Sequence, residues 1–124
     1  MAKKKREIRW LDEPESHDYP AALSYLSLVY RVPQAKALVA RLRKVRVTTF
    51  KAKDIFRAST LSSLGVSNAR VKRDQEKIAK QVPLSPILLV RDITHGKVVI
   101  ADGYHRLCAV YSFNEDAEIP CKIV

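Results

Sequence analysis

Glycine and cysteine are scarce in this chain, and long apolar runs are absent. Three glycines in 124 residues exclude a long glycine-rich loop around a phosphate. Two cysteines, Cys108 and Cys121, cannot make a disulfide framework, and both lie in apolar stretches. We therefore expect buried, reduced thiols and a cytoplasmic protein. Because no run could span a bilayer and no apolar stretch follows basic residues 3–6, we expect neither a membrane partner nor a secretory signal.

Acidic residues are also few relative to basic ones. The chain has 13 Asp and Glu against 23 Lys and Arg, for a formal net charge of +10. Residues 31–53 contain eight basic residues and no acidic one. Such a field favours anionic partners: nucleotides, DNA or RNA, or acidic proteins. The alternative is a solvated basic surface that keeps the protein soluble.

The length fits one compact domain. We expect an arm over 1–19 whose first nine residues are disordered, a helical hairpin over 20–44 and an α+β domain with a small mixed sheet over 45–124. Hydrophobic periodicity and turn residues predict helices at 21–30, 33–44, 53–58 (a short helix or turn), 69–81 and 104–113, and strands at 45–50, 86–90, 97–101 and 118–124. A turn at Thr94-His95-Gly96 should pair the strands at 86–90 and 97–101 as an antiparallel hairpin. The last two strands and the helix between them should form a βαβ-like unit.

The most informative segment is the turn from Asp102 to Arg106. An apolar strand leads into an Asp-Gly pair, and a helical pattern begins at Tyr104. Gly103 permits close approach of a ligand to the backbone. Tyr104 is a further candidate to bind the ligand, because the first turn of the helix offers N–H groups and the positive end of the helix dipole. Together with the Arg106 guanidinium and the His105 imidazole, this layout predicts a phosphate site.

Some of these side chains have a second interpretation. Arg106 could pair with Glu115 or Asp116, but both lie far along the helix, so we favour anion binding and expect the fold to survive its loss. His105 could fix the helix start instead of acting as a general acid or base. Asp102 could be the N-cap of the helix instead of a base or metal ligand.

A second basic cluster falls on the predicted helix at 69–81. Arg70, Arg73 and Lys77 are spaced so that they share one face. Val71, Ile78 and Val82 should form its buried stripe. The alternative is a solvated basic face.

The segment 84–124 resembles the ParB/sulfiredoxin superfamily, with looser similarity from about residue 45. The residues that carry the resemblance are LSPILLV at 84–90, VVIADGYHRLCA at 98–109 and EIPCKIV at 118–124. Families of this kind pair a proline-led strand with a Gly-x-His-Arg or Gly-x-Arg-Arg turn and a closing strand. Sulfiredoxins need a cysteine directly after the turn glycine, where this chain has Tyr104, so we do not expect sulfinic acid reduction.

The resemblance implies a nucleotide site, for ATP, ADP or CTP with Mg²⁺, at the Gly103 turn. The helix at 69–81 would form its second wall. Ser67 or Asn68, one of which should cap that helix, and Ser85 are candidates to line the same pocket. The related free-serine kinases need a carboxylate base near the first strand, and Asp54 is the acidic residue in that region.

We therefore expect a domain that binds a nucleotide or another phosphorylated ligand, with NTP hydrolysis or phosphoryl transfer as a further activity. An anion should bind between Arg106 and the 70–77 face, which we expect to present no acidic side chain. The alternatives are a non-enzymatic nucleic-acid-binding module that uses residues 31–53 and the basic arm at residues 3–6, and an accessory protein without chemistry. The pattern leaves the oligomeric state open.

Overall fold

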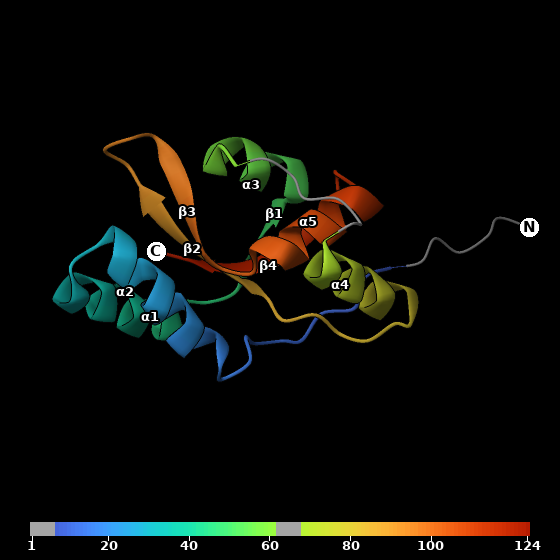
Figure 1. The fold of residues 1–124 in the computed structure, drawn as a ribbon, viewed down its shortest axis with the longest axis horizontal. Coiled ribbons are helices and arrows are strands. Elements are labelled where there is room, and N and C mark those ends of the chain that lie inside the picture. The colour runs from blue at the N-terminus through green and yellow to red at the C-terminus, as the bar shows by residue number, and fades with distance from the viewer. Residues whose placement is uncertain (1–6, 62–67) are drawn as a thin grey trace, which may run out of the picture.

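The computed structural model describes residues 7–61 and 68–124 (Figure 1). Its helices and strands are, in chain order, α1 (Asp18–Val29), α2 (Val32–Lys44), β1 (Thr48–Lys51), α3 (Ala52–Ser59), α4 (Ala69–Ala79), β2 (Ile87–Asp92), β3 (Lys97–Asp102), α5 (Tyr104–Phe113) and β4 (Glu118–Ile123). The expected α+β class with a small mixed sheet is confirmed. In the described ranges, no helix is both long enough and apolar enough to cross a lipid bilayer.

The sheet has the strand order β1-β4-β2-β3. The predicted hairpin of β2 and β3 is confirmed, and β4 pairs parallel with β2 and antiparallel with β1. Since β3 is antiparallel to β2 and β4 is parallel to it, β3 and β4 run in opposite directions. The expected βαβ-like unit is therefore wrong: α5 returns the chain past β2 instead of joining two neighbouring parallel strands.

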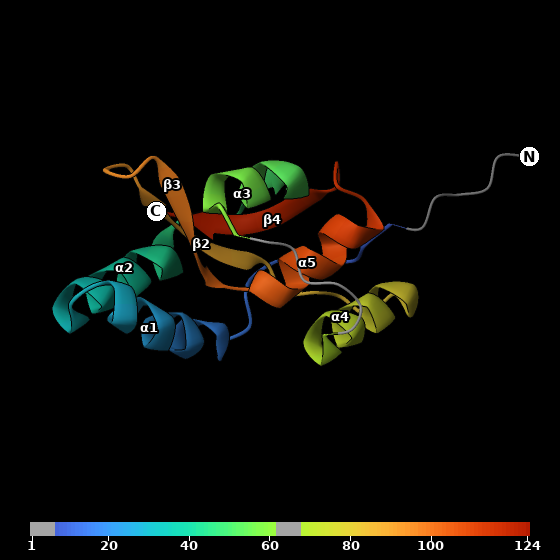
Figure 2. The same ribbon diagram turned by 45° about the horizontal axis from the view of Figure 1, so that its top comes forward.

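The strand β2 is covered on both faces, which explains its unbroken apolar run. Leu88 and Val90 pack with the buried residues of α1 and α2, whereas Ile87 and Leu89 pack with those of α3, α4 and α5. A strand that is buried on both sides needs no polar alternation. Figure 2 shows α1 paired with α2 at one end of the molecule and α4 beside α5 at the other.

The N-terminal helices form as a pair, but their boundaries differ from the prediction. Helix α1 begins three residues early, with Pro20 inside its first turn, where a missing N–H costs no helical hydrogen bond. Helix α2 ends at Lys44, and the Val45 N–H still bonds to the Arg41 carbonyl. The predicted strand therefore begins only at Thr48, because the chain reaches the edge of the sheet there.

Helix α4 begins at its predicted cap. The Asn68 side chain accepts hydrogen bonds from the backbone N–H groups of Arg70 and Val71, at 3.0 and 3.2 Å. Val71 and Ile78 are buried as predicted, but Val82 is 41% exposed. The helix ends at Ala79, and a left-handed φ of 60° at Gln81 turns the chain away before Val82.

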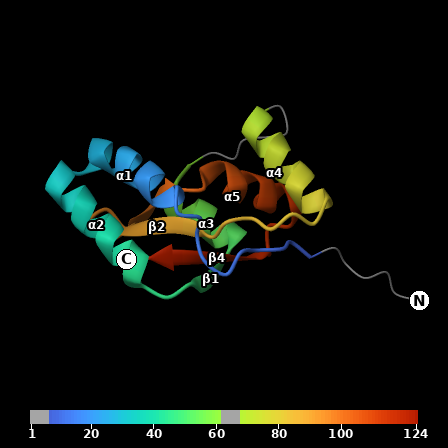
Figure 3. The ribbon, with the colours of Figure 1, turned by 90° about the horizontal axis from the view of Figure 1, so that it is seen from below.

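The part of the expected N-terminal arm that the structure describes is bound to the domain, so the expected disorder is wrong for residues 7–9. Backbone hydrogen bonds join Leu84 to Arg9 and Leu11, each at 2.8 Å, and the Gln81 amide donates to the Glu7 carbonyl. Figure 3 shows this segment running beside the chain that leads into β2. It continues into α1 and thereby places the acidic first turn of α1 next to Ser85.

Candidate functional site

The turn between β3 and α5 requires a glycine. Gly103 has a φ of 106°, a left-handed conformation that side chains rarely adopt. A Cβ at this position would lie 2.9 Å from Arg106 Nη2 and 2.9 Å from Ile87 Cγ1. Gly103 is also the N-cap of α5, so the first turn of this helix has no side-chain cap. The predicted helix at 104–113 is confirmed at both ends.

A cavity of about 200 Å³ lies between α4 and this turn. Helix α4 contributes Arg70, Arg73, Asp74 and Lys77 to its lining. The turn and the start of α5 contribute Asp102, Gly103, His105 and Arg106. Two groups of residues that are separate in sequence thus meet around one space, as the predicted two-wall arrangement requires.

Asp74 contradicts the expectation that the 70–77 face presents no acidic side chain. It lies in the lining of the cavity and is only 9% exposed. Its carboxylate has no hydrogen bond or ion pair within 4 Å with any described residue. Burial raises its pKa, and the nearby Arg106, Lys77, His105 and Arg73 oppose that rise. The cavity therefore contains a carboxylate among cations.

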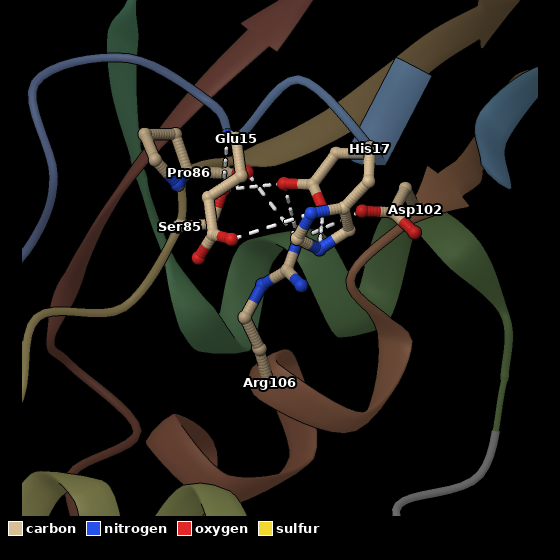
Figure 4. A network of polar contacts seen from close by, with 7 residues as sticks. Glu15, His17, Ser85, Pro86, Asp102 and Arg106 are labelled. Carbon is tan, nitrogen blue, oxygen red and sulfur yellow. Dashed lines mark hydrogen bonds and ion pairs between the residues drawn. The ribbon is translucent and has the colours of Figure 1, made fainter. Parts of the chain in front are cut away.

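Arg106 is bound to carboxylates of the protein itself (Figure 4). Its Nη2 lies 2.9 Å from Asp102 Oδ2 and 3.7 Å from Asp18 Oδ2, and it donates to the Pro86 carbonyl at 3.4 Å. The Ser85 hydroxyl donates to Asp18 Oδ2, which links the network to α1. The alternative partners Glu115 and Asp116 do not pair with Arg106, which pairs instead with Asp102, four residues earlier in the chain.

Asp102 is an ion-pair partner and not the N-cap of α5. Burial raises its pKa, the Arg106 guanidinium opposes this rise, and the nearby Asp18 carboxylate adds to it. The two carboxylates share one guanidinium, whose Nε is buried and has no hydrogen-bond partner among the described residues. Arg106 therefore has a structural role in addition to any role toward a ligand.

His105 lies in the lining of the cavity with its imidazole partly buried. Burial lowers its pKa, Arg70 and Arg106 lower it further, and Asp74 opposes them. The ring is consequently neutral at neutral pH and offers one donor and one acceptor nitrogen. Tyr104 is not part of the lining; its ring centroid lies 5.6 Å from that of His105.

The other predicted site residues lie elsewhere. Asp54 borders a different, mostly apolar cavity of about 220 Å³ beside β1 and α3, and it pairs with Arg57 at 3.2 Å. Asn68 is occupied by the cap of α4, and Ser85 by the bond to Asp18. Ser67 lies outside the described residues.

The predicted buried thiols are confirmed. Cys108 and Cys121 form no disulfide and are fully buried, on the side of the sheet covered by α3, α4 and α5. Burial raises the pKa of Cys121 to about 12, so this thiol is not ionised at neutral pH. A thiol in that state is a poor nucleophile.

The sequence reasoning missed two functional candidates, Asp74 and Asp18. Asp74 had a usable signal, because it lies three residues after Val71 and four before Ile78, on the stripe that was predicted to be buried. Asp18 had none: its contact with Arg106 joins the first turn of α1 to α5, and nothing in the local pattern of either segment indicates it.

Comparisons with known proteins identify no relative: no family model matches the chain, and no curated protein or solved structure is significantly similar to it. The resemblance to ParB-like and sulfiredoxin-like proteins consequently depends on the motif residues alone.

Proposed function

We propose that the cavity between α4 and the Gly103 turn binds a phosphate group of a nucleotide or another small phosphorylated ligand. One observation carries this proposal. Four cationic side chains from two elements, namely Arg70, Arg73, Lys77 and Arg106, line the same space as the start of α5. The N-terminus of a helix attracts anions, and arginine forks match the geometry of phosphate oxygens.

The charge balance supports an anionic ligand. The four cations face two carboxylates, and one of these, Asp102, is already paired with Arg106. A volume of about 200 Å³ is small compared with typical ligand pockets of roughly 300–1,000 Å³. We therefore propose that the cavity takes the phosphate group and that the rest of the ligand extends through its open side. The ParB-like motif at residues 98–109 favours the same assignment.

Catalysis remains a prediction. Among the lining residues, neutral His105 is the group suited to proton transfer in phosphoryl transfer or NTP hydrolysis. A Mg²⁺ bound together with ATP, ADP or CTP also remains a prediction. The residues suit a resident Mg²⁺ poorly, because no three His, Cys, Asp or Glu side chains of the described ranges form a metal-binding group.

Replacing Arg73 with alanine should weaken the binding of ATP, ADP, CTP or inorganic phosphate by roughly 10- to 100-fold, because one charge-assisted contact is lost. Calorimetric titration, with and without Mg²⁺, measures this effect. Lys72→Ala is the matched control: it removes the same charge from the same helix, but Lys72 is exposed and does not line this cavity. Equal affinity of the Arg73→Ala and Lys72→Ala variants would exclude this cavity as the binding site.

A non-sequence-specific nucleic-acid-binding surface on α2 is the second candidate. The last turn of α2 carries Arg41, Arg43 and Lys44, all exposed, and no acidic residue lies between 31 and 53. Arg43 lies over the ring of Tyr19, at 4.4 Å from its centroid. A solvated basic surface of this kind binds phosphates through counterion release.

If α2 binds nucleic acid, affinity should fall steeply with salt and depend little on sequence. Replacing Arg41 and Lys44 together with alanine should reduce the slope of log K against log salt by about 2 for duplex DNA, since each phosphate contact contributes about 0.9. The double variant Lys72→Ala, Lys80→Ala is the control, because it removes the same charge from α4 and its C-cap. Fluorescence anisotropy measures the slope. No binding at low salt, or the same slope in both variants, would reject this candidate.

A further inference from the structure

Asp74 is an acidic group in a site that we propose for an anion. The residue is nine-tenths buried, yet it lies in the lining of the cavity. Arg73 and Lys77 lie on either side of it on α4, but no cation of the described chain comes within 4 Å of its carboxylate. The carboxylate faces the cavity and has no donor from the described chain, so a ligand that fills the cavity and supplies a donor is favoured over one that does not.

The charges around Asp74 still allow an anion to bind, but they favour an anion that can donate a hydrogen bond. The lining cations attract any tetrahedral oxyanion, while the Asp74 carboxylate repels an oxygen that carries no proton. An oxyanion with its own O–H group can instead donate a hydrogen bond to the ionised Asp74 carboxylate, and this attraction replaces the repulsion. A closely similar ligand that lacks the donor is then rejected, because its binding would displace water from the Asp74 carboxylate and leave this acceptor unpaired.

We infer that Asp74 makes the cavity selective for a phosphate group that donates a hydrogen bond, and that it discriminates against sulfate. This inference rests on the proposed phosphate function and names the chemistry that the same site selects. The donor is the proton retained by hydrogen phosphate or a hydroxyl next to the phosphate of an ester. Sulfate has the same shape and, in mildly alkaline buffer, the same charge as hydrogen phosphate, but it has no proton to donate.

The test is a calorimetric titration of the protein with inorganic phosphate and with sulfate. Mildly alkaline buffer makes phosphate divalent like sulfate and, although burial raises the pKa of Asp74, favours the ionised carboxylate. Wild-type protein should bind phosphate roughly 10- to 100-fold more tightly than sulfate, as expected for one hydrogen bond to a charged group. In Asp74→Asn, the amide can donate to either anion, so sulfate binding should strengthen and the preference should largely disappear. Glu76→Gln removes the same charge from the exposed face of α4 and should keep the wild-type preference.

Two further ligands distinguish the source of the donor. Ethyl phosphate and 2-hydroxyethyl phosphate differ by one hydroxyl, and both are fully ionised in this buffer. If 2-hydroxyethyl phosphate binds more tightly than ethyl phosphate, and Asp74→Asn removes this difference, the ligand is a phosphate ester with a neighbouring hydroxyl. Weak binding of both esters alongside tight binding of phosphate identifies the free ion. Either pattern supports selection by a donor.

Three results would overturn the inference. Equal binding of phosphate and sulfate by wild-type protein would show that Asp74 does not select, while leaving the proposed phosphate site intact. A phosphate preference that survives in Asp74→Asn would assign the selection to another group. Failure of the wild-type protein to bind either anion would remove the proposed function and, with it, this inference.

Discussion

Replacing Arg106 with methionine should lower the free energy of unfolding by about 3–5 kcal/mol, the usual cost of breaking a buried ion pair on one side. The Arg106 side chain is 17% exposed, and the Asp18 and Asp102 side chains are 3% and 18% exposed. Methionine retains much of the apolar packing but leaves both carboxylates without their cation. This revises the expectation from the sequence that the fold does not need Arg106.

The pH dependence of the stability loss in Arg106→Met shows that the unpaired carboxylates cause it. Burial raises the pKa of Asp102 and Arg106 opposes that rise, so Asp102 binds its proton more tightly in the folded chain than in the unfolded chain. Its contribution to stability is thus present at low pH and is lost as pH rises through the folded pKa. Because removing Arg106 raises that pKa further, the penalty should be largest at neutral pH and shrink in acid.

Urea unfolding at neutral and acidic pH measures both effects. Arg57→Met is the control, because Arg57 is 85% exposed in its pair with Asp54, and breaking an exposed pair costs less than about 1 kcal/mol. If Arg106→Met unfolded at the same urea concentration as Arg57→Met, the network would contribute nothing to stability.

Replacing Gly103 with alanine should destabilise the protein by about 2–6 kcal/mol and abolish phosphate binding. The left-handed backbone costs a residue with a side chain about 1–3 kcal/mol, and crowding in a packed core adds a similar amount. The new methyl group would lie 2.9 Å from both Arg106 Nη2 and Ile87 Cγ1. The guanidinium would therefore have to move out of the position in which it pairs with Asp102 and lines the cavity.

The Gly96→Ala variant separates the cost of the left-handed backbone from the cost of crowding. Gly96 also has a left-handed φ, of 62°, but an added Cβ there meets nothing within 4 Å. This control should show a strain penalty of about 1–2 kcal/mol and unchanged phosphate binding. Thermal unfolding and calorimetric titration of both variants test the prediction. If the two alanine variants lost the same stability and both bound phosphate normally, the close packing around Gly103 would have no functional consequence.

The sequence by itself determined the local features of the fold. The Asp-Gly turn and the apolar pattern after it predicted α5, because a left-handed glycine and helical spacing are both encoded within a few residues. The hairpin of β2 and β3 and the Asn68 cap were predictable for the same reason. Each of these depends on interactions between residues that are close in the chain.

Only the tertiary structure decided how these local elements meet and which charges are paired. The parallel pairing of β4 with β2 brings the end of the chain to the centre of the sheet. The contact of Arg106 with Asp18 depends on where α1 docks, and the exposure of the Asp74 carboxylate to the cavity depends on how α4 packs beside α5. Periodicity indicates which face of a helix is buried, but it does not identify the segment that buries it. The physical reason is that packing and ion pairing join residues far apart in sequence, where no local preference of the backbone operates.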